Sequence, residues 1–148
     1  MSLKSRIQND VKQAMRARDK ARLPVLRLIT AAIKQREVDE RIELSDGDVL
    51  AVLDKMAKQR RESLEQYRKA GRDDLADQEQ FELELLGEFM PEPLGEAELE
   101  RLIQAAIEET GASSMRDMGA VMAALREQVQ GRADMKAVSD SVRARLAS

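Results

Sequence analysis

The residues best placed for chemistry lie in a short connection near the C-terminus, Val129-Gln-Gly-Arg-Ala-Asp-Met-Lys136. It joins two predicted helices, so the free backbone N–H groups of a helix start would lie beside the cations of Arg132 and Lys136. Oriented amides and cations that converge in this way can hold a phosphate. Arg126 and Arg143, on the neighbouring helices, could flank the same point. These four basic residues are the candidate phosphate-binding residues.

The same connection also has a purely structural interpretation. Gly131 can end one helix in the left-handed conformation, and Asp134 can cap the start of the next. The basic side chains would then simply be solvated, and the Asp134 carboxylate would partly repel an anion. Both interpretations remain open at this point.

The composition excludes most catalytic and metal-binding chemistry. The chain of 148 residues contains no Cys and no His, so thiol nucleophiles, zinc thiolate sites, Ser-His-Asp triads and His-ligated metals are absent. Glycine-rich phosphate loops of the Walker or Rossmann type are also missing. Three aromatic residues are too few for a platform that stacks bases. We therefore predict no catalytic residue, no metal site and no cofactor.

Paired carboxylates are frequent in the predicted helix of residues 73–89. A metal or acid/base site would require such groups to face inward in a partly dry pocket. Here they lie mostly on the face opposite the apolar stripe, so a solvated face is predicted. The pairs considered are Glu82 with Asp77 or Glu79, and Glu84 with Glu88.

The formal net charge of −3 conceals a strong segregation along the chain. The net charge is +6 over residues 1–70, −11 over residues 71–110 and +2 over residues 111–148. Long solvated helices can produce such blocks without any function. Alternatively, the two basic ends face a polyanion and the acidic middle does not.

Apolar residues recur at helical spacing along nearly the whole chain, which predicts an all-α protein. About four helices would form an N-terminal domain over residues 1–90. Ser2 or Ser5 would cap the first, Asp19 the second, and Ser45 with Asp48 a long third helix over about 46–70. The second helix would end within the polar run 36–43, the third would stop at Gly71, and the fourth would run from 73 to 89.

Two prolines and a glycine interrupt the helical pattern at residues 91–95, which we interpret as a linker. Residues 96–148 would then form a three-helix C-terminal domain. Its first helix spans 96–110, its second is capped by Ser114 and its third by Asp134. The chain has no apolar run long enough to span a membrane and no apolar signal-peptide region near its start. A cytoplasmic location without a membrane partner is therefore expected.

In segment order, the whole chain resembles the YqeY family of small bacterial proteins. The stretches that carry the resemblance include Ser114-Met-Arg-Asp-Met-Gly-Ala-Val-Met122, followed by Gly131-Arg-Ala-Asp-Met-Lys136. Others are Leu23-Pro-Val-Leu-Arg-Leu-Ile29, Ala31-Ala-Ile33, Lys58-Gln-Arg-Arg-Glu-Ser63, Tyr67-Arg-Lys-Ala-Gly-Arg-Asp-Asp-Leu75 and Phe89-Met-Pro-Glu-Pro-Leu94.

The last part is also similar to the tail domain of the B subunit of glutamyl/aspartyl-tRNA amidotransferase. The resemblance implies a helical N-terminal domain and a three-helix tail-like domain that, in the amidotransferase, binds tRNA. It makes Gly119, Gly131 and Asp134 structural motif residues. Two positions depart from the family pattern: Ala120 stands where Lys is common, and Met135 where Gly is frequent.

Three functional hypotheses follow. The first is a non-catalytic protein that binds tRNA or another structured RNA through Arg126, Arg132, Lys136 and Arg143. The second is a protein-interaction module whose acidic helix meets a basic partner. The third is a component of a glutamine-dependent carbon–nitrogen ligase, or amidotransferase. The amidotransferase catalytic domain is not present in these residues, so the third rests on family association alone.

Overall fold

The computed structural model describes residues 1–147 and confirms the all-α prediction. Within that range every regular element is helical and none is a strand. The chain divides into two compact units, one formed by Met1–Met90 and the other starting at Pro91. The elements are α1 (Leu3–Ala17), α2 (Arg22–Glu40), α3 (Asp46–Lys69), α4 (Asp73–Gly87), α5 (Glu96–Thr110), the 3₁₀ turn η1 (Met115–Asp117), α6 (Met118–Val129) and α7 (Met135–Ala147).

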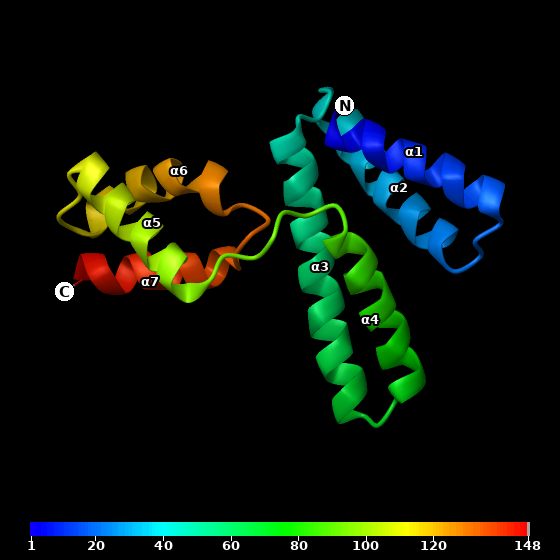
Figure 1. The fold of residues 1–148 in the computed structure, drawn as a ribbon. Coiled ribbons are helices and arrows are strands. Elements are labelled where there is room, and N and C mark those ends of the chain that lie inside the picture. Colours follow the sequence, from blue (N-terminus) through cyan, green and yellow to red (C-terminus); the bar gives the residue numbers. More distant parts are fainter. Residues whose placement is uncertain (148) are drawn as a thin grey trace. The chain divides into compact units, whose positions relative to one another are not determined.

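The N-terminal unit consists of two helical hairpins, α1–α2 and α3–α4, and α1 and α2 pack beside the first half of α3 (Figure 1). Its apolar core joins both hairpins, and the end of the α3–α4 hairpin near Gly71 extends beyond that core. The most deeply buried core residues are Ile7, Leu26, Ile29, Val49, Leu53, Leu85 and Leu86.

Helix starts in this unit follow the local sequence signals. The Ser2 hydroxyl accepts a hydrogen bond from the N–H of Ser5, and Asp19 Oδ1 accepts from the N–H of Arg22 at 3.0 Å. Ser45 and Asp48 form a complete capping box at the start of α3. The caps at Ser2 and Ser45 agree with the predicted ones, because each side chain satisfies an amide that has no partner within the helix. In α2 the N-cap position is Ala21, and Asp19 reaches the first amide of the helix from two residues further back.

Helix ends show one difference from prediction. Gly71 lies just beyond α3 with a φ of 70°, as the predicted left-handed stop requires. The fourth helix, however, ends at Gly87 rather than at residue 89. Phe89 is still buried in the core, at 3% exposure, because the chain continues through a turn that keeps the ring against it.

Glu82 is an exception to the prediction that the carboxylates of this region are solvated. It is a buried charged residue, at 8% exposure, and its Oε1 lies 3.7 Å from Nη2 of Arg60 on α3. Its neighbour Glu79 is less buried, but burial raises the pKa of Glu79 and the Glu82 carboxylate adds to that rise. The acidic face of α4 therefore includes one carboxylate that turns inward to an arginine.

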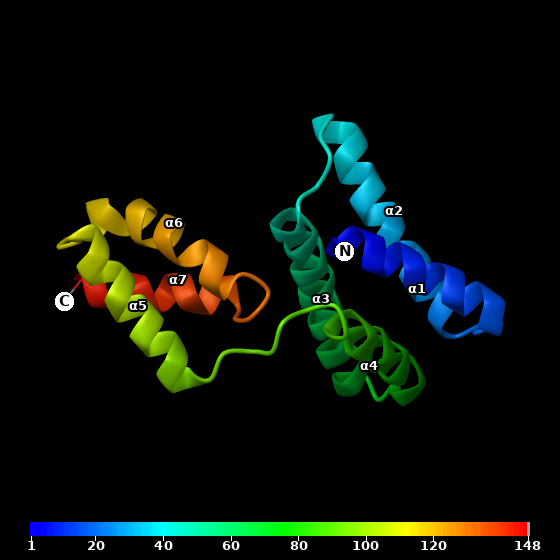
Figure 2. The same cartoon turned by 45° about the horizontal axis from the view of Figure 1, so that its top comes forward.

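The C-terminal unit packs α5, α6 and α7 around a separate aliphatic core (Figure 2). Ser114 and Asp117 form a second capping box. It caps the 3₁₀ turn η1, and α6 begins only after that turn. Gly111 ends α5 with a φ of 67°, as predicted. The buried residues of this core are Ile103, Ala106, Val121, Leu125, Val129, Val138, Val142 and Leu146. In the described part of the chain, no helix has the length and apolar character needed to cross a bilayer.

Candidate phosphate-binding site

The candidate site is the turn between α6 and α7. Val129, fully buried at the end of α6, fixes its start, and its carbonyl accepts hydrogen bonds from the N–H groups of Arg132 and Ala133. Gly131 makes the reversal with a φ of 76°, a conformation that glycine adopts without steric cost. The local sequence therefore forces the chain to turn sharply and to begin α7 within a few residues.

Asp134 occupies the helix start that would have to receive a phosphate. Its Oδ1 accepts a hydrogen bond from the N–H of Lys136 at 3.2 Å, and its carbonyl accepts from the N–H of Val138 at 3.0 Å. This is the N-cap role that the sequence indicates. An anion at this helix start would compete with a carboxylate that is already bound there.

Arg132 holds the Pro/Gly segment in place. Its Nε donates a hydrogen bond to the carbonyl of Glu92 at 3.0 Å, and its own carbonyl accepts from the N–H of Leu94 at 2.8 Å. Residues 91–95 form no helix, so their backbone groups need partners from outside the segment. Arg132 supplies two of them and is half-buried as a result.

The other three candidate cations are exposed. Lys136 lies in the first turn of α7 and Arg126 in the last turn of α6. Arg143 lies about two turns further along α7, roughly 10 Å from Lys136 along the helix axis, and its Nη1 is 3.2 Å from Oδ1 of Asp140. Arg132 thus lies in the turn and Lys136 at the start of α7, four residues later, with Arg126 at the adjoining helix end. Arg143 lies apart from it.

The two departures from the family pattern have different surroundings. Met135 is half-buried and packs against the C-terminal core, so its side chain makes apolar contact that a glycine would lack. Ala120 is exposed beside Gly119 in the first turn of α6. A Cβ added at Gly119 would meet nothing within 4 Å, so packing inside this unit does not require glycine there.

The capping box ahead of α6 also affects the ionisation of its carboxylate. Asp117 Oδ2 accepts hydrogen bonds from the N–H groups of Ser113 and Ser114 at 2.9 and 3.2 Å. These bonds hold the pKa of the Asp117 carboxyl below its usual value, because they favour the charged form. Within residues 1–147, no group of three Asp or Glu side chains is arranged to hold a metal ion.

Sequence reasoning identified the caps of this site but missed the contact between Arg132 and the segment that precedes α5. A usable signal was present. Pro91 and Pro93 prevent regular structure, and the carbonyls of such a segment require donors from elsewhere in the unit. A cation in the facing turn is the natural donor.

Comparison with known proteins gives a match over almost the entire chain. The family model described as Yqey-like protein matches residues 4–146. Altered inheritance of mitochondria protein 41 of Pyrenophora tritici-repentis is 32% identical over 142 residues, which cover 93% of this chain and 77% of that protein. The protein of the same name from Eremothecium gossypii is 38% identical over 85 residues, covering 57% of this chain and 46% of its own length.

The expectation of a cytoplasmic location is wrong by this comparison. Both of these relatives are named as mitochondrial proteins. The expectation rested on composition and on the sequence near the chain start, and neither of these specifies a compartment.

Proposed function

This chain belongs to the YqeY family, and from that premise we propose that it is a non-catalytic protein that binds tRNA or another structured RNA through phosphate contacts. The supporting observation is the C-terminal unit, a three-helix domain with its own core. Its residues 114–122 and 131–136 resemble the tRNA-binding tail of the amidotransferase B subunit. The α6–α7 turn of that unit presents the exposed cations Arg126 and Lys136.

Local cations rather than net attraction would carry this binding. Residues 91–148 contain seven basic and ten acidic residues, a net charge of −3. RNA would therefore be held where Arg126 and Lys136 can reach phosphates and would be repelled elsewhere on the unit. Contacts of this kind position a nucleic acid but convey little sequence preference.

A filter-binding titration with unfractionated tRNA at several salt concentrations tests the proposal. The variant is Arg126→Glu with Lys136→Glu, because Arg132 also supports the fold through its bond to Glu92. Each lost phosphate contact lowers the slope of log affinity against log salt by roughly 0.7–0.9. We expect the wild-type protein to bind at low salt and the variant to bind more weakly, with a slope smaller by about 1.5.

A matched control is available on α3. Arg61 and Arg68 are exposed and make no side-chain ion pair among the described residues, so Arg61→Glu with Arg68→Glu changes the net charge by the same amount. This control should bind tRNA nearly as tightly as wild type. Absence of binding by the wild-type protein at low salt would contradict the proposal.

The acidic face of α4 favours a second candidate function, a module that binds a basic protein. Asp73, Asp74, Asp77 and Glu84 are exposed on a helix that contains no basic residue. Stoichiometric capture of one protein partner that persists after nuclease treatment would support this function.

The names of the relatives make the mitochondrion the compartment to examine first in an organism that has one.

Participation in a carbon–nitrogen ligase with glutamine as amido donor is a third candidate, and family association is its only support. Amidation of misacylated tRNA by this chain alone would establish it and would overturn the non-catalytic proposal.

A further inference from the structure

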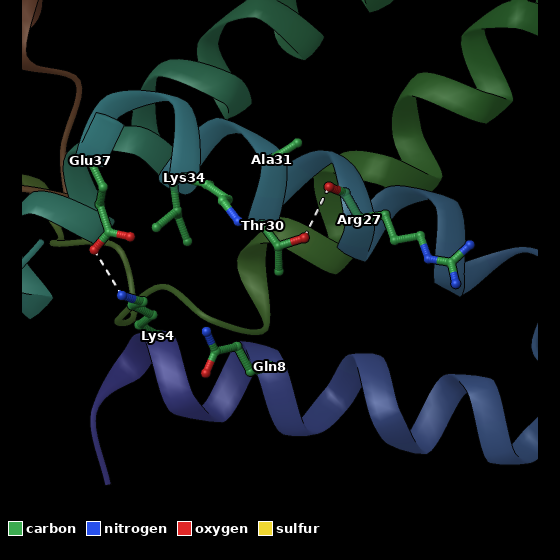
Figure 3. Close-up of a pocket in the computed structure, with 8 residues that line it drawn as sticks. Lys4, Gln8, Arg27, Thr30, Ala31, Lys34 and Glu37 are labelled. Carbon is green, nitrogen blue, oxygen red and sulfur yellow. Dashed lines mark hydrogen bonds and ion pairs between the residues drawn. The ribbon is translucent and has the colours of Figure 1, made fainter. Parts of the chain in front are cut away.

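A groove of about 540 Å³ lies between α1 and α2 in the N-terminal unit. Lys4 and Gln8 project into it from α1, and Arg27, Thr30, Lys34 and Glu37 line it from α2 (Figure 3). The size is that of an ordinary ligand site, but the lining is mainly cationic and polar. The nature of these side chains therefore decides what the groove can bind.

The single carboxylate in the groove is already neutralised. Lys4 Nζ donates to Oε2 of Glu37 at 2.8 Å, and the N–H of Leu44 donates to the same oxygen at 2.9 Å. The bond from Lys4 is the main reason that the pKa of Glu37 lies below its usual value, and the Leu44 bond adds to it. Glu37 thus stays ionised and paired, and its repulsion of an incoming anion is small.

Arg27 and Lys34 remain available for a ligand. Both are exposed, and neither side chain makes a hydrogen bond or a close ion pair with another described residue. Lys34 attracts Glu37 only at longer range. By contrast, Arg22 and Arg36 on the same helix are engaged with carboxylates of other segments.

The two available cations lie seven residues apart on one face of α2, about 10 Å along the helix axis. Arg27 offers a planar fork of donors that suits a phosphate, and Lys34 offers a compact point charge. Because of this separation, each cation can contact a different phosphate. The hydroxyl of Thr30 lies between them on the groove wall and donates to the Arg27 carbonyl.

The surrounding hairpin supplies a favourable field. Residues 1–41 contain eleven basic and five acidic residues, whereas residues 42–70 contain six of each. The whole basic excess of the first seventy residues therefore belongs to α1, α2 and their turns. Such a local potential attracts a polyanion even though the N-terminal unit as a whole is neutral.

We propose that the α1–α2 groove is a second RNA-contacting surface, which binds the sugar–phosphate backbone through Arg27 and Lys34. This inference rests on the proposed function and places part of the contact in a unit that the amidotransferase tail resemblance does not cover. A protein partner fits less well, because the two apolar residues of the lining are Ala31, which is small, and Ile33, which is buried in the core, and no aromatic anchor accompanies them. A lipid surface fits less well, because the exposed apolar side chains of α2, Leu28 and Val38, are ten residues apart and do not form the continuous apolar face of a membrane-binding helix.

The test uses the full chain and the variant Arg27→Glu with Lys34→Glu. In the tRNA titration we expect about a tenfold or greater loss of affinity at low salt, and a salt slope smaller by about 1.5. Arg61→Glu with Arg68→Glu is the matched control, because these residues are also exposed and seven apart on one helix. Arg27→Lys with Lys34→Arg keeps the charges and should retain most of the affinity.

A second measurement locates the contact without any substitution. A ten-nucleotide oligoribonucleotide added to isotope-labelled protein should shift the backbone amide resonances of Gln8, Thr30 and Ala31. Anionic lipid vesicles added in a parallel titration should leave them unchanged.

Circular dichroism of the groove variant should match that of the wild type, because both substituted side chains are exposed.

The outcomes separate the two proposals. If tRNA binding is weakened by Arg126→Glu with Lys136→Glu but not by the groove variant, and the groove amides do not shift, the proposed function stands and the groove inference fails. If the groove variant loses binding and the turn variant does not, the inference stands and the α6–α7 turn is not the site. If only vesicles shift the groove amides, the groove inference fails. If the wild-type protein binds neither tRNA nor the oligoribonucleotide, both the groove inference and the proposed function fail.

Discussion

The two units of this protein use their charged residues differently. In the N-terminal unit, arginines and lysines connect separate helices: Arg22 bonds to Asp10 on α1 and to Glu88 after α4, and Lys4 bonds to Glu37 on α2. In the described part of the C-terminal unit, the ion pairs of Arg101 and Arg143 each remain within one helix. The pair that joins two helices there is Arg145 with Glu100, at 3.6 Å.

The apolar cores differ in a corresponding way. The N-terminal core includes Phe89, over whose ring the Arg6 guanidinium lies at 5.1 Å, and Arg6 also donates to the Glu88 carbonyl at 2.7 Å. The C-terminal core is entirely aliphatic or methionine-lined. The N-terminal unit thus combines its core with several cations that join helices, whereas in the described part of the C-terminal unit Arg145 joins α7 to α5 and Arg132 bonds to the segment before α5. A cation of the N-terminal unit must therefore be shown to lack a bridging role before it is assigned to a ligand.

The largest expected effect comes from removing a core side chain of the C-terminal unit. Leu125 is fully buried, and Leu125→Ala should cost about 2–5 kcal/mol. A unit of fewer than sixty residues has little stability to lose, so α5, α6 and α7 should lose most of their protection. Amide hydrogen exchange followed by NMR measures this directly.

Leu53→Ala provides the equivalent change in the N-terminal unit, since Leu53 is also fully buried. Its cost should be similar, but the bridging ion pairs and larger core should leave that unit folded at room temperature. Complete unfolding of the N-terminal unit by Leu53→Ala, with α5–α7 protected in Leu125→Ala, would contradict the comparison.

A smaller effect is expected from removing one bridging arginine in each unit. Arg22→Met keeps the apolar stem but breaks the bonds to Asp10 and Glu88, and should cost about 1–2 kcal/mol. Arg145→Met removes an ion pair with the well-exposed Glu100 and a hydrogen bond to Gln104, which is also exposed, and should cost about 0.5 kcal/mol. Urea unfolding followed by circular dichroism gives both values. Equal costs would show that the two units do not differ in their dependence on charge.

Much of this architecture was predictable from the sequence because it depends on local signals. The caps at Ser45, Asp48 and Asp134, and the glycine stops at Gly71 and Gly111, act through residues only a few positions away. Helix spacing and caps together therefore predict each α-helix of the described residues and most of the helix ends, but not the 3₁₀ turn η1. The early end of the fourth helix was missed because the core keeps Phe89 buried outside the helix.

The roles of individual charges were less predictable, because they depend on contacts distant in sequence. Arg132 bonds to a carbonyl forty residues earlier, Lys4 to a carboxylate thirty-three residues later, and Arg60 approaches Glu82 from another helix. No local pattern distinguishes these residues from Arg27 or Lys34, which make no such bond. The sequence could thus place the candidate site on a turn. It could not show which of the cations there are engaged in contacts within the fold and which are free to bind a ligand.

The smallest effect concerns pH. Each unit has a carboxylate with a shifted pKa, and the two shifts have opposite directions. In the C-terminal unit the folded pKa of Asp117 is lowered, mainly by the N–H of Ser113 and then by that of Ser114. Its contribution to stability is therefore present above the unfolded pKa of about 3.9 and lost as the pH falls through the lower folded value. Asp117→Asn keeps an acceptor without the charge, so it should reduce stability at pH 7 and flatten the loss of stability below about pH 4.

Glu79 in the N-terminal unit should behave in the opposite way. Burial raises its folded pKa. At pH values just above the unfolded pKa of about 4.3, the folded state therefore binds more protons than the unfolded state. Stability consequently declines as the pH rises from the unfolded pKa through the folded pKa. Glu79→Gln removes this penalty and should stabilise the unit slightly at pH 7, with no benefit at pH 3. Urea midpoints measured for both variants at pH 3, 5 and 7 test the pair. The Asp117 carboxylate is held by backbone amides, whereas that of Glu79 is desolvated beside Glu82. The two substitutions should therefore change the urea midpoint at pH 7 in opposite directions. A change in the same direction would show that packing around these side chains, and not their ionisation, controls stability.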